Sequence, residues 1–153
     1  MKSVLKGEKN RILLLVFLTL LFILWARVIV FEIRQGAKTQ NLDTVLKRTA
    51  CAKGFGWEVD PGSEKSEKIR IPEKFGDVYK NYNTLQKKCG FDLSPYRGKT
   101  VIKYTYIVLN PPENSKDMFY LNILIYDNEM IGGDVQTVAL DGFMLPVVRG
   151  NDA

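Results

Sequence analysis

Three aspartates and three glycines lie among apolar residues near the end of the chain, and acidic residues beside glycines can bind a metal ion or a phosphate. The six residues are Asp127, Gly132, Gly133, Asp134, Asp141 and Gly142. A phosphate-binding loop places its glycines between a strand and a helix, with a Lys and a Ser or Thr. Here the glycines lie inside a segment of β pattern, and no helix is expected after it.

A calcium loop is excluded for a different reason. It needs oxygen ligands at alternating positions within one short loop, whereas these aspartates are spread over fifteen positions, from Asp127 to Asp141. The sequence therefore predicts no metal site and no cofactor, and turns and a bulge explain most of these residues. Asp134 stays a candidate site residue, because an acid beside a bulge can point into a groove.

The residues that could catalyse a reaction are few. The chain contains no histidine, which is the commonest general base near neutral pH. Asp134 with Asp141 or Glu58 are conceivable carboxylate pairs, but spacing on strands cannot place them together. Ser94 and Lys99 are near each other in the sequence, but such neighbours are common by chance. We predict no catalytic residue and no enzymatic activity.

The chain has two cysteines, Cys51 and Cys89, and neither belongs to a C-x-x-C pair. They could form a disulfide in an oxidising compartment. Two buried thiols explain them equally well, so both alternatives stay open.

The N-terminal part of the chain is strongly apolar. Residues 12–26 carry no charge, and after Arg27 the apolar run continues to residue 31. A helix needs about 20 apolar residues to cross a membrane, and Trp25 and Arg27 are suited to an interface, where an arginine can extend its charge to the headgroups. The pattern predicts a transmembrane signal anchor over 12–31. A cleaved signal peptide and a buried core helix are the alternatives.

The orientation follows from the basic residues that precede this run, which are Lys2, Lys6, Lys9 and Arg11. They give a slight basic excess over the other side, so 1–11 is predicted to be cytoplasmic. The predicted localisation is the cell membrane, as a single-pass protein whose C-terminal domain is extracytoplasmic.

The net charge of +5 does not indicate nucleic-acid binding once it is divided along the chain. Residues 1–36 carry six Lys or Arg against two acidic residues, whereas 37–153 carry sixteen against fifteen. The basic excess therefore belongs to the N-terminal segment. The remainder lacks the basic excess that nucleic-acid-binding domains usually show.

The remainder of the chain contains patterns of both helices and strands. After a linker over 32–41, helical spacing predicts one helix that begins at Asn41 and a second that begins at Pro72 and ends at Gly90. Strands are predicted over 55–59, 68–71, 101–109 and 119–125, and a returning strand follows the turn at Asp127–Asn128. The predicted buried positions of the two helices are Leu42, Val45, Leu46, Thr49, Phe75, Val78, Tyr79, Tyr82, Leu85 and Cys89.

These elements predict an α+β fold with the order α-β-β-α-β-β-β, in which two helices pack on one face of an antiparallel sheet. The domain would cover 42–148 and be followed by a short tail over 149–153. Gly132–Gly133 would form a bulge or a close approach of backbones, and Asp92 or Ser94 would cap a turn before the sheet.

Five motifs in this order resemble one known family. They are Phe55-Gly56-Trp57-Glu58-Val59, Gly90-Phe91-Asp92-Leu93-Ser94 continued by Tyr96-x-Gly98-Lys99, Tyr104-Thr105-Tyr106 with Val108-Leu109-Asn110, Ile131-Gly132-Gly133-Asp134-Val135, and Ala139-Leu140-Asp141-Gly142-Phe143-Met144. The set resembles domain of unknown function 4830, a small membrane-anchored domain of Gram-positive spore-forming bacteria. The resemblance implies a bacterial protein tethered by one N-terminal helix, and it assigns no catalytic or binding residue. Neither cysteine belongs to these motifs.

The function that we expect is a non-enzymatic, extracytoplasmic binding or sensing module of a bacterial cell envelope. Its partner would be an unidentified protein or envelope polymer, bound at an exposed sheet face bearing Tyr104, Tyr106 and Tyr120. One alternative is a structural subunit of an envelope or sporulation-related complex, which pairs the edge of its hairpin with a neighbour's sheet. Another alternative is a histidine-free hydrolase.

Overall fold

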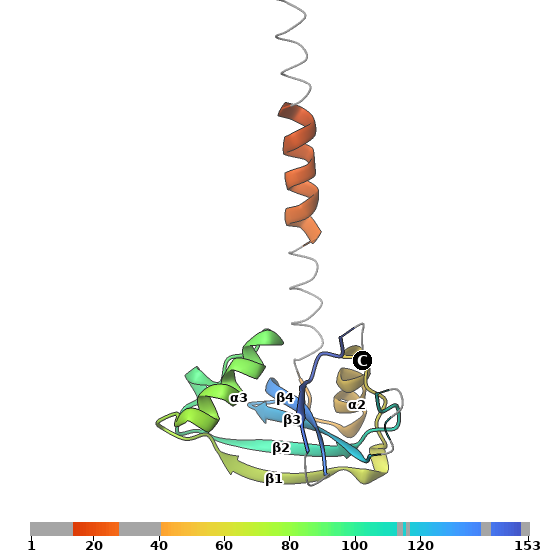
Figure 1. Ribbon diagram of the computed structural model, residues 1–153, viewed down its shortest axis with the longest axis vertical. Helices are drawn as coiled ribbons and strands as arrows, with labels where there is room; N and C mark the ends of the chain where they lie inside the picture. Colours follow the sequence, from red (N-terminus) through yellow and green to blue (C-terminus); the bar gives the residue numbers. More distant parts are fainter. Residues whose placement is uncertain (1–13, 28–40, 113–114, 116, 139–141, 151–153) are drawn as a thin grey trace, which may run out of the picture. The chain divides into compact units, whose positions relative to one another are not determined.

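The computed structural model describes residues 14–27, 41–112, 115, 117–138 and 142–150 (Figure 1). The chain divides into two compact units, residues 1–37 and residues 38–153. Each unit is described by itself.

The N-terminal unit contains a helix over residues 14–27, whose large apolar side chains are exposed. None of the helices that the structure describes combines the length and the apolar composition needed to cross a membrane. The N-terminal transmembrane helix predicted over 12–31 is therefore wrong as a part of the described fold. Residues 12, 13 and 28–31 of that prediction lie outside the described residues.

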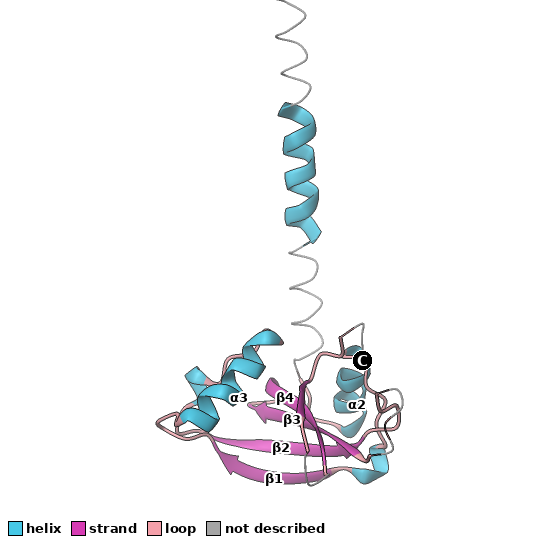
Figure 2. Cartoon of the chain, in the orientation of Figure 1, coloured by secondary structure: helices cyan, strands magenta, loops and turns pink. Residues whose placement is uncertain are grey.

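The second unit contains a five-stranded antiparallel sheet in the order β1-β2-β3-β4-β5. Its elements are α2 (Val45–Gly54), η1 (Pro61–Ser63), β1 (Lys65–Arg70), α3 (Asp77–Lys88), η2 (Ser94–Tyr96), β2 (Thr100–Ile107), β3 (Phe119–Tyr126), β4 (Glu129–Thr137) and β5 (Met144–Pro146). The short helix η1 lies at the start of β1 (Figure 2).

The observed order of α-helices and strands in this unit is α-β-α-β-β-β-β, which corrects the predicted α-β-β-α-β-β-β. The predicted strand over 55–59 makes only one isolated bridge, between Val59 and Val108. The Asn110 side chain takes the place of a ladder there, since its Oδ1 accepts from Glu58 N at 2.7 Å and its Nδ2 donates to Gly56 O at 3.0 Å. The additional strand is β5, which pairs with the end of β4.

The two helices lie against opposite faces of the sheet, and not on one face as predicted. Alternate residues of a strand point to opposite faces, and β3 is buried on both. Leu121 and Ile123 belong to the core cluster that contains Cys51 and Ala52 of α2. Leu124 belongs to the other cluster, against which Tyr79 and Tyr82 of α3 pack. The reason is that β3 and β4 are apolar at consecutive positions, so that both faces need cover.

Helix α2 also begins later than predicted and buries a different side. Thr44 is its N-cap, with Oγ1 accepting from Lys47 N at 3.3 Å. Leu46 is 78% exposed, whereas Arg48 is 4% exposed. The spacing of apolar residues did not predict that the side of α2 bearing Arg48 is buried. Arg48 is buried there because it forms an ion pair with Glu64, which lies 16 residues away in the sequence.

The second helix, α3, begins at Asp77 and not at Pro72, after the N-cap residue Gly76. Its predicted buried position Val78 is 84% exposed, whereas Asn83 and Gln86 are buried. Helical spacing alone did not predict these two polar residues, which are buried because other segments supply hydrogen-bond partners. Asn83 accepts from Leu93 N at 2.8 Å, and Gln86 accepts from Gly133 N at 2.8 Å.

The hairpin between β3 and β4 is confirmed in its details. Asp127 and Asn128 have φ of 53° and 64°, which is the left-handed conformation that tight hairpin turns require. The register shifts opposite Leu124 and Ile125, which confirms a bulge in this hairpin. At Gly133 an added Cβ would lie 2.6 Å from Asn122 O, so this position has room only for glycine.

Candidate functional site

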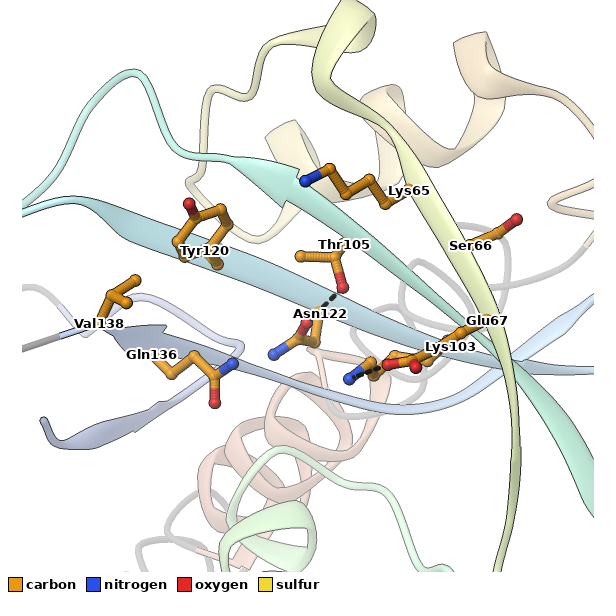
Figure 3. Close-up of a pocket in the computed structure, with 9 residues that line it drawn as sticks. All are labelled: Lys65, Ser66, Glu67, Lys103, Thr105, Tyr120, Asn122, Gln136 and Val138. Carbon is orange, nitrogen blue, oxygen red and sulfur yellow. Dashed lines mark hydrogen bonds and ion pairs between the residues drawn. The ribbon is translucent and has the colours of Figure 1, made fainter.

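Part of the sheet face that carries α3 is left uncovered by the helix and forms an open cavity of about 560 Å³ (Figure 3). We call this surface the open face. Its lining residues come from four neighbouring strands or their ends, namely Lys65, Ser66, Glu67, Lys103, Thr105, Tyr120, Asn122, Gln136 and Val138. These residues are far apart in the sequence, since α3 lies between β1 and β2, and only the folded sheet brings them together.

The strand registers arrange the side chains of the open face in rows that run across the strands. The central row consists of Lys65, Thr105, Asn122 and Asp134, which are paired partners on β1, β2, β3 and β4. On one side lies an outer row of Ile107, Tyr120, Gln136 and Met144. On the other side Glu67 is paired with Lys103. The open face thus has an apolar and aromatic margin, a hydrogen-bonding centre and a charged margin.

A buried hydrogen-bond network holds the central row in place. Thr105 Oγ1 donates to Asn122 Oδ1 at 2.8 Å, and Asn122 Nδ2 donates to Asp134 Oδ1 at 2.8 Å. Tyr82 of α3 donates to Asp134 Oδ2 at 2.8 Å. Asn122 and Asp134 are each 3% exposed. Asp134 is therefore a positioning residue, which orients Asn122 beneath the cavity.

The charges of the open face are unevenly balanced. Lys103 makes an ion pair with Glu67 (Figure 3). Among the described residues, Lys65 has no carboxylate within ion-pair distance. Burial raises the pKa of the Asp134 carboxyl, and the hydrogen bonds from Asn122 and Tyr82 and the Lys103 charge offset part of that rise. The cavity therefore presents an ammonium group that is available to an anionic ligand.

The predicted site residues are divided between different places. Tyr120 and Asp134 belong to the open face or its support. Tyr104 and Tyr106 point to the opposite face, where Tyr106 is buried and the Arg48 guanidinium lies 3.9 Å from the centre of the Tyr104 ring. The three tyrosines therefore do not form one surface.

Trp25 and Arg27, predicted as membrane-interface residues, lie on the described helix of the N-terminal unit, and Trp25 is 63% exposed. Cys51 and Cys89, both within the described residues, carry thiols in this structure. The Cys51 Sγ lies 3.8 Å from Met130 Sδ in the core. Cys51 is buried and Cys89 is half-buried, and the possible disulfide between them stays a prediction.

The candidate catalytic pairs do not form a described site. Asp141 lies outside the described residues. Glu58 is exposed and its backbone N–H donates to Asn110, whereas Asp134 is buried and accepts from Asn122 and Tyr82. Ser94 belongs to a capped turn, as predicted, because Asp92 Oδ1 accepts from Ser94 N at 2.9 Å. Among the described residues, no group of three His, Cys, Asp or Glu side chains could hold a metal ion.

Sequence reasoning missed Lys65, Thr105, Asn122 and Gln136 as surface residues of one site. One signal was present, since Asn122 interrupts the apolar strand FYLNILIY. A polar side chain is buried in such a strand only when it has hydrogen-bond partners. Its position could have indicated a polar network, but its partners on β2 and β4 could be named only with the strand register.

Comparison with known families identifies the domain that carries the open face. The model of the family described as Domain of unknown function (DUF4830) matches residues 52–135. The chain belongs to this family. The matched residues include the whole central row of the open face, from Lys65 to Asp134. No curated protein and no solved structure matches the chain.

The hydroxyl of Tyr82 is expected to stabilise the DUF4830 domain through Asp134. Tyr82→Phe removes one of the two hydrogen bonds that Asp134 accepts from side chains, so we expect a loss of about 1–3 kcal/mol in the free energy of unfolding. Urea denaturation followed by circular dichroism measures it. Tyr79→Phe is the matched control on the same helix, because no described residue hydrogen-bonds its hydroxyl, and we expect a change below about 0.5 kcal/mol. Equal losses in the two variants would contradict this role of Asp134.

Asp134 is also expected to make the stability of the DUF4830 domain depend on pH. Burial raises the folded pKa of the Asp134 carboxyl above its ordinary value of 3.8, so the folded state binds the proton more tightly than the unfolded state. Its contribution to stability is therefore full below pH 3.8 and is lost as the pH rises through the folded pKa.

Asp134→Asn removes this titration. The free energy of unfolding of the wild type minus that of Asp134→Asn should fall as the pH rises from about 4 to 7. Urea titrations of both proteins at each pH measure the difference. A difference that stays constant or grows with pH would show that Asp134 has no raised pKa.

Proposed function

We propose that the DUF4830 domain is a non-enzymatic binding domain, and that its open face holds an extended segment of a partner protein. The observation that carries the proposal is the central row, whose hydrogen-bonding side chains are oriented by a buried network and yet border an uncovered cavity. A network that served only the fold could be covered by the helix that already packs on this face. Pre-oriented polar groups lower the cost of ordering the surface on binding.

The chemistry of the open face favours a peptide over a sugar polymer. Its outer row contains the apolar side chains Ile107 and Met144, and the apolar Val138 lines the cavity close to that row. Tyr120 is the one aromatic side chain among the described residues that line the cavity. Side chains of a peptide suit such a mixed apolar and polar margin. Gln136 makes no side-chain hydrogen bond with the described residues, so both its donor and its acceptor are available to a ligand.

The alternative of a structural subunit that adds strands at the hairpin is less well supported. Both hairpin strands already have neighbours, since β3 pairs with β2 and β4 pairs with β5. The edge strands of the described sheet are β1, whose sequence KSEKIR places charges at four of its six positions, and β5, which has three residues and ends at Pro146. Charged side chains on an edge strand disfavour edge-to-edge pairing. The extracytoplasmic envelope location stays a prediction.

Selection of random peptides displayed on phage, with the full-length chain as the immobilised target, tests the proposed function. A variant carrying Lys65→Ala and Gln136→Ala removes two side chains of the open face. Lys68→Ala is the matched control, because Lys68 lies on the opposite side of β1 and does not line this cavity. We expect peptides that bind the wild type and the control with similar affinity, and the first variant at least about tenfold more weakly.

Two outcomes would overturn the proposal. One is a selection that yields no peptide with preference for the wild type over the first variant. The other is binding of oligosaccharides from an immobilised set, in the absence of peptide binding, which would replace the peptide by a sugar polymer.

A further inference from the structure

The arrangement of charge and apolar surface on the open face indicates what kind of peptide it would select. We infer that it recognises an extended segment in which an acidic side chain and an apolar side chain lie four residues apart, the acid at Lys65 and the apolar group against Tyr120 and Val138. This inference rests on the proposed function and adds the sequence pattern of the partner.

The acidic position follows from Lys65. This lysine lies on the edge strand β1 at one end of the central row, and its side chain extends over the cavity towards Thr105 and Tyr120 (Figure 3). Lys103, the other lysine of the lining, is already paired with Glu67. Among the described residues Lys65 thus lacks a carboxylate partner, which an acidic side chain of the ligand would supply.

The apolar position follows from the other end of the open face. Val138 is 66% exposed and Met144 is 42% exposed, and Tyr120 lies beside them in the outer row. Met118 is a further exposed side chain here, since the Tyr120 hydroxyl lies 3.1 Å from its Sδ. These neighbouring apolar groups would contact an apolar side chain of the ligand and remove it from water.

The spacing follows from the sheet geometry. Lys65 lies on β1 and Tyr120 lies on β3, two strands away, and Tyr120 is two residues along its strand from Asn122, the β3 member of the Lys65 row. Neighbouring strands are about 4.8 Å apart and two residues along a strand span about 6.8 Å, so the two positions are separated by about 12 Å. In an extended peptide, residues that share one face and are four positions apart lie about 13 Å apart. Thr105, beside Lys65, and Gln136, beside Tyr120, can hydrogen-bond the peptide backbone.

Synthetic peptides of defined spacing test the inference on the full-length chain. Fluorescein-labelled peptides carry one Asp and one Leu separated by two, four or six positions in a Gly, Ser and Thr background, and fluorescence anisotropy measures their Kd. We expect the four-residue spacing to bind at least about fivefold more tightly than the other two. Lys65→Glu should weaken that peptide about tenfold, and replacing its Asp by Lys should restore binding to Lys65→Glu. Lys68→Glu, on the opposite side of the same strand, is the control and should change little.

The outcomes separate this inference from the proposed function. Equal affinities at all spacings, or no effect of Lys65→Glu, would overturn the inference while peptide binding stands. The same holds if phage-selected peptides bind the open face and none of the synthetic ones does. If neither the selected nor the synthetic peptides bind, the proposed function itself fails.

Discussion

Replacing Arg48 with alanine is expected to lower the free energy of unfolding by about 3–5 kcal/mol, the usual cost of removing one partner from a buried ion pair. Arg48 Nη2 lies 2.8 Å from Glu64 Oε1, and the side chains of the pair are 5% and 19% exposed. The guanidinium also donates to Leu42 O at 2.9 Å and to the Tyr106 hydroxyl at 3.0 Å. Arg48→Ala leaves these acceptors in the core with fewer donors.

The adjacent residue supplies the control. Lys47 makes an ion pair with Asp43 on the surface of the same helix, where the two side chains are 44% and 47% exposed. Such a pair contributes roughly 0.2–1 kcal/mol, so Lys47→Ala should change stability by no more than about 1 kcal/mol. Urea unfolding of both variants and the wild type gives the comparison. A loss below about 1 kcal/mol for Arg48→Ala would mean that Glu64 and Tyr106 find other partners.

Introducing a methyl group at Gly133 is the second change with a large expected effect. The Cβ of Gly133→Ala would lie 2.6 Å from Asn122 O and 2.8 Å from Met130 Cε. The methionine end can move, but the carbonyl belongs to the neighbouring strand β3 and cannot move without disturbing its pairing. We expect a loss of about 3 kcal/mol, at the upper end of what overpacking costs.

Gly150→Ala is the matched control, because an added Cβ there has nothing within 4 Å, and its stability should stay within about 0.5 kcal/mol of the wild type. Thermal or urea unfolding measures both variants. A shift of β3 in Gly133→Ala would also displace Asn122, whose side chain belongs to the central row. Loss of peptide binding at a temperature where the variant is still folded would follow. A variant as stable as the control would contradict the close approach of the two strands.

The importance of Gly133 for the fold could be predicted from the sequence, whereas that of Arg48 could not. The pair Gly132–Gly133 within a strand pattern predicts a bulge or a close approach of backbones, and both are present. Arg48 gave no such indication, because a charged residue within a helix usually faces solvent. Its partners Glu64 and Tyr106 are 16 and 58 residues away in the sequence.

The sequence by itself determined the features that depend on neighbouring residues. The turn at Asp127–Asn128, the capped turn at Asp92 and the antiparallel hairpin follow from local hydrogen bonding and from the φ values that these residue types tolerate. The membrane span predicted over 12–31 was not confirmed, since none of the helices that the structure describes is long and apolar enough to cross a membrane.

Only the tertiary structure decided which face of the sheet each helix covers and which side chains form the open face. Lys65, Thr105, Asn122 and Asp134 lie on four strands, and their alignment depends on three separate registers. A shift of one residue in any of these registers would turn that strand's side chains to the other face. The surface is thus a consequence of strand pairing over long distances in sequence, which local patterns do not specify.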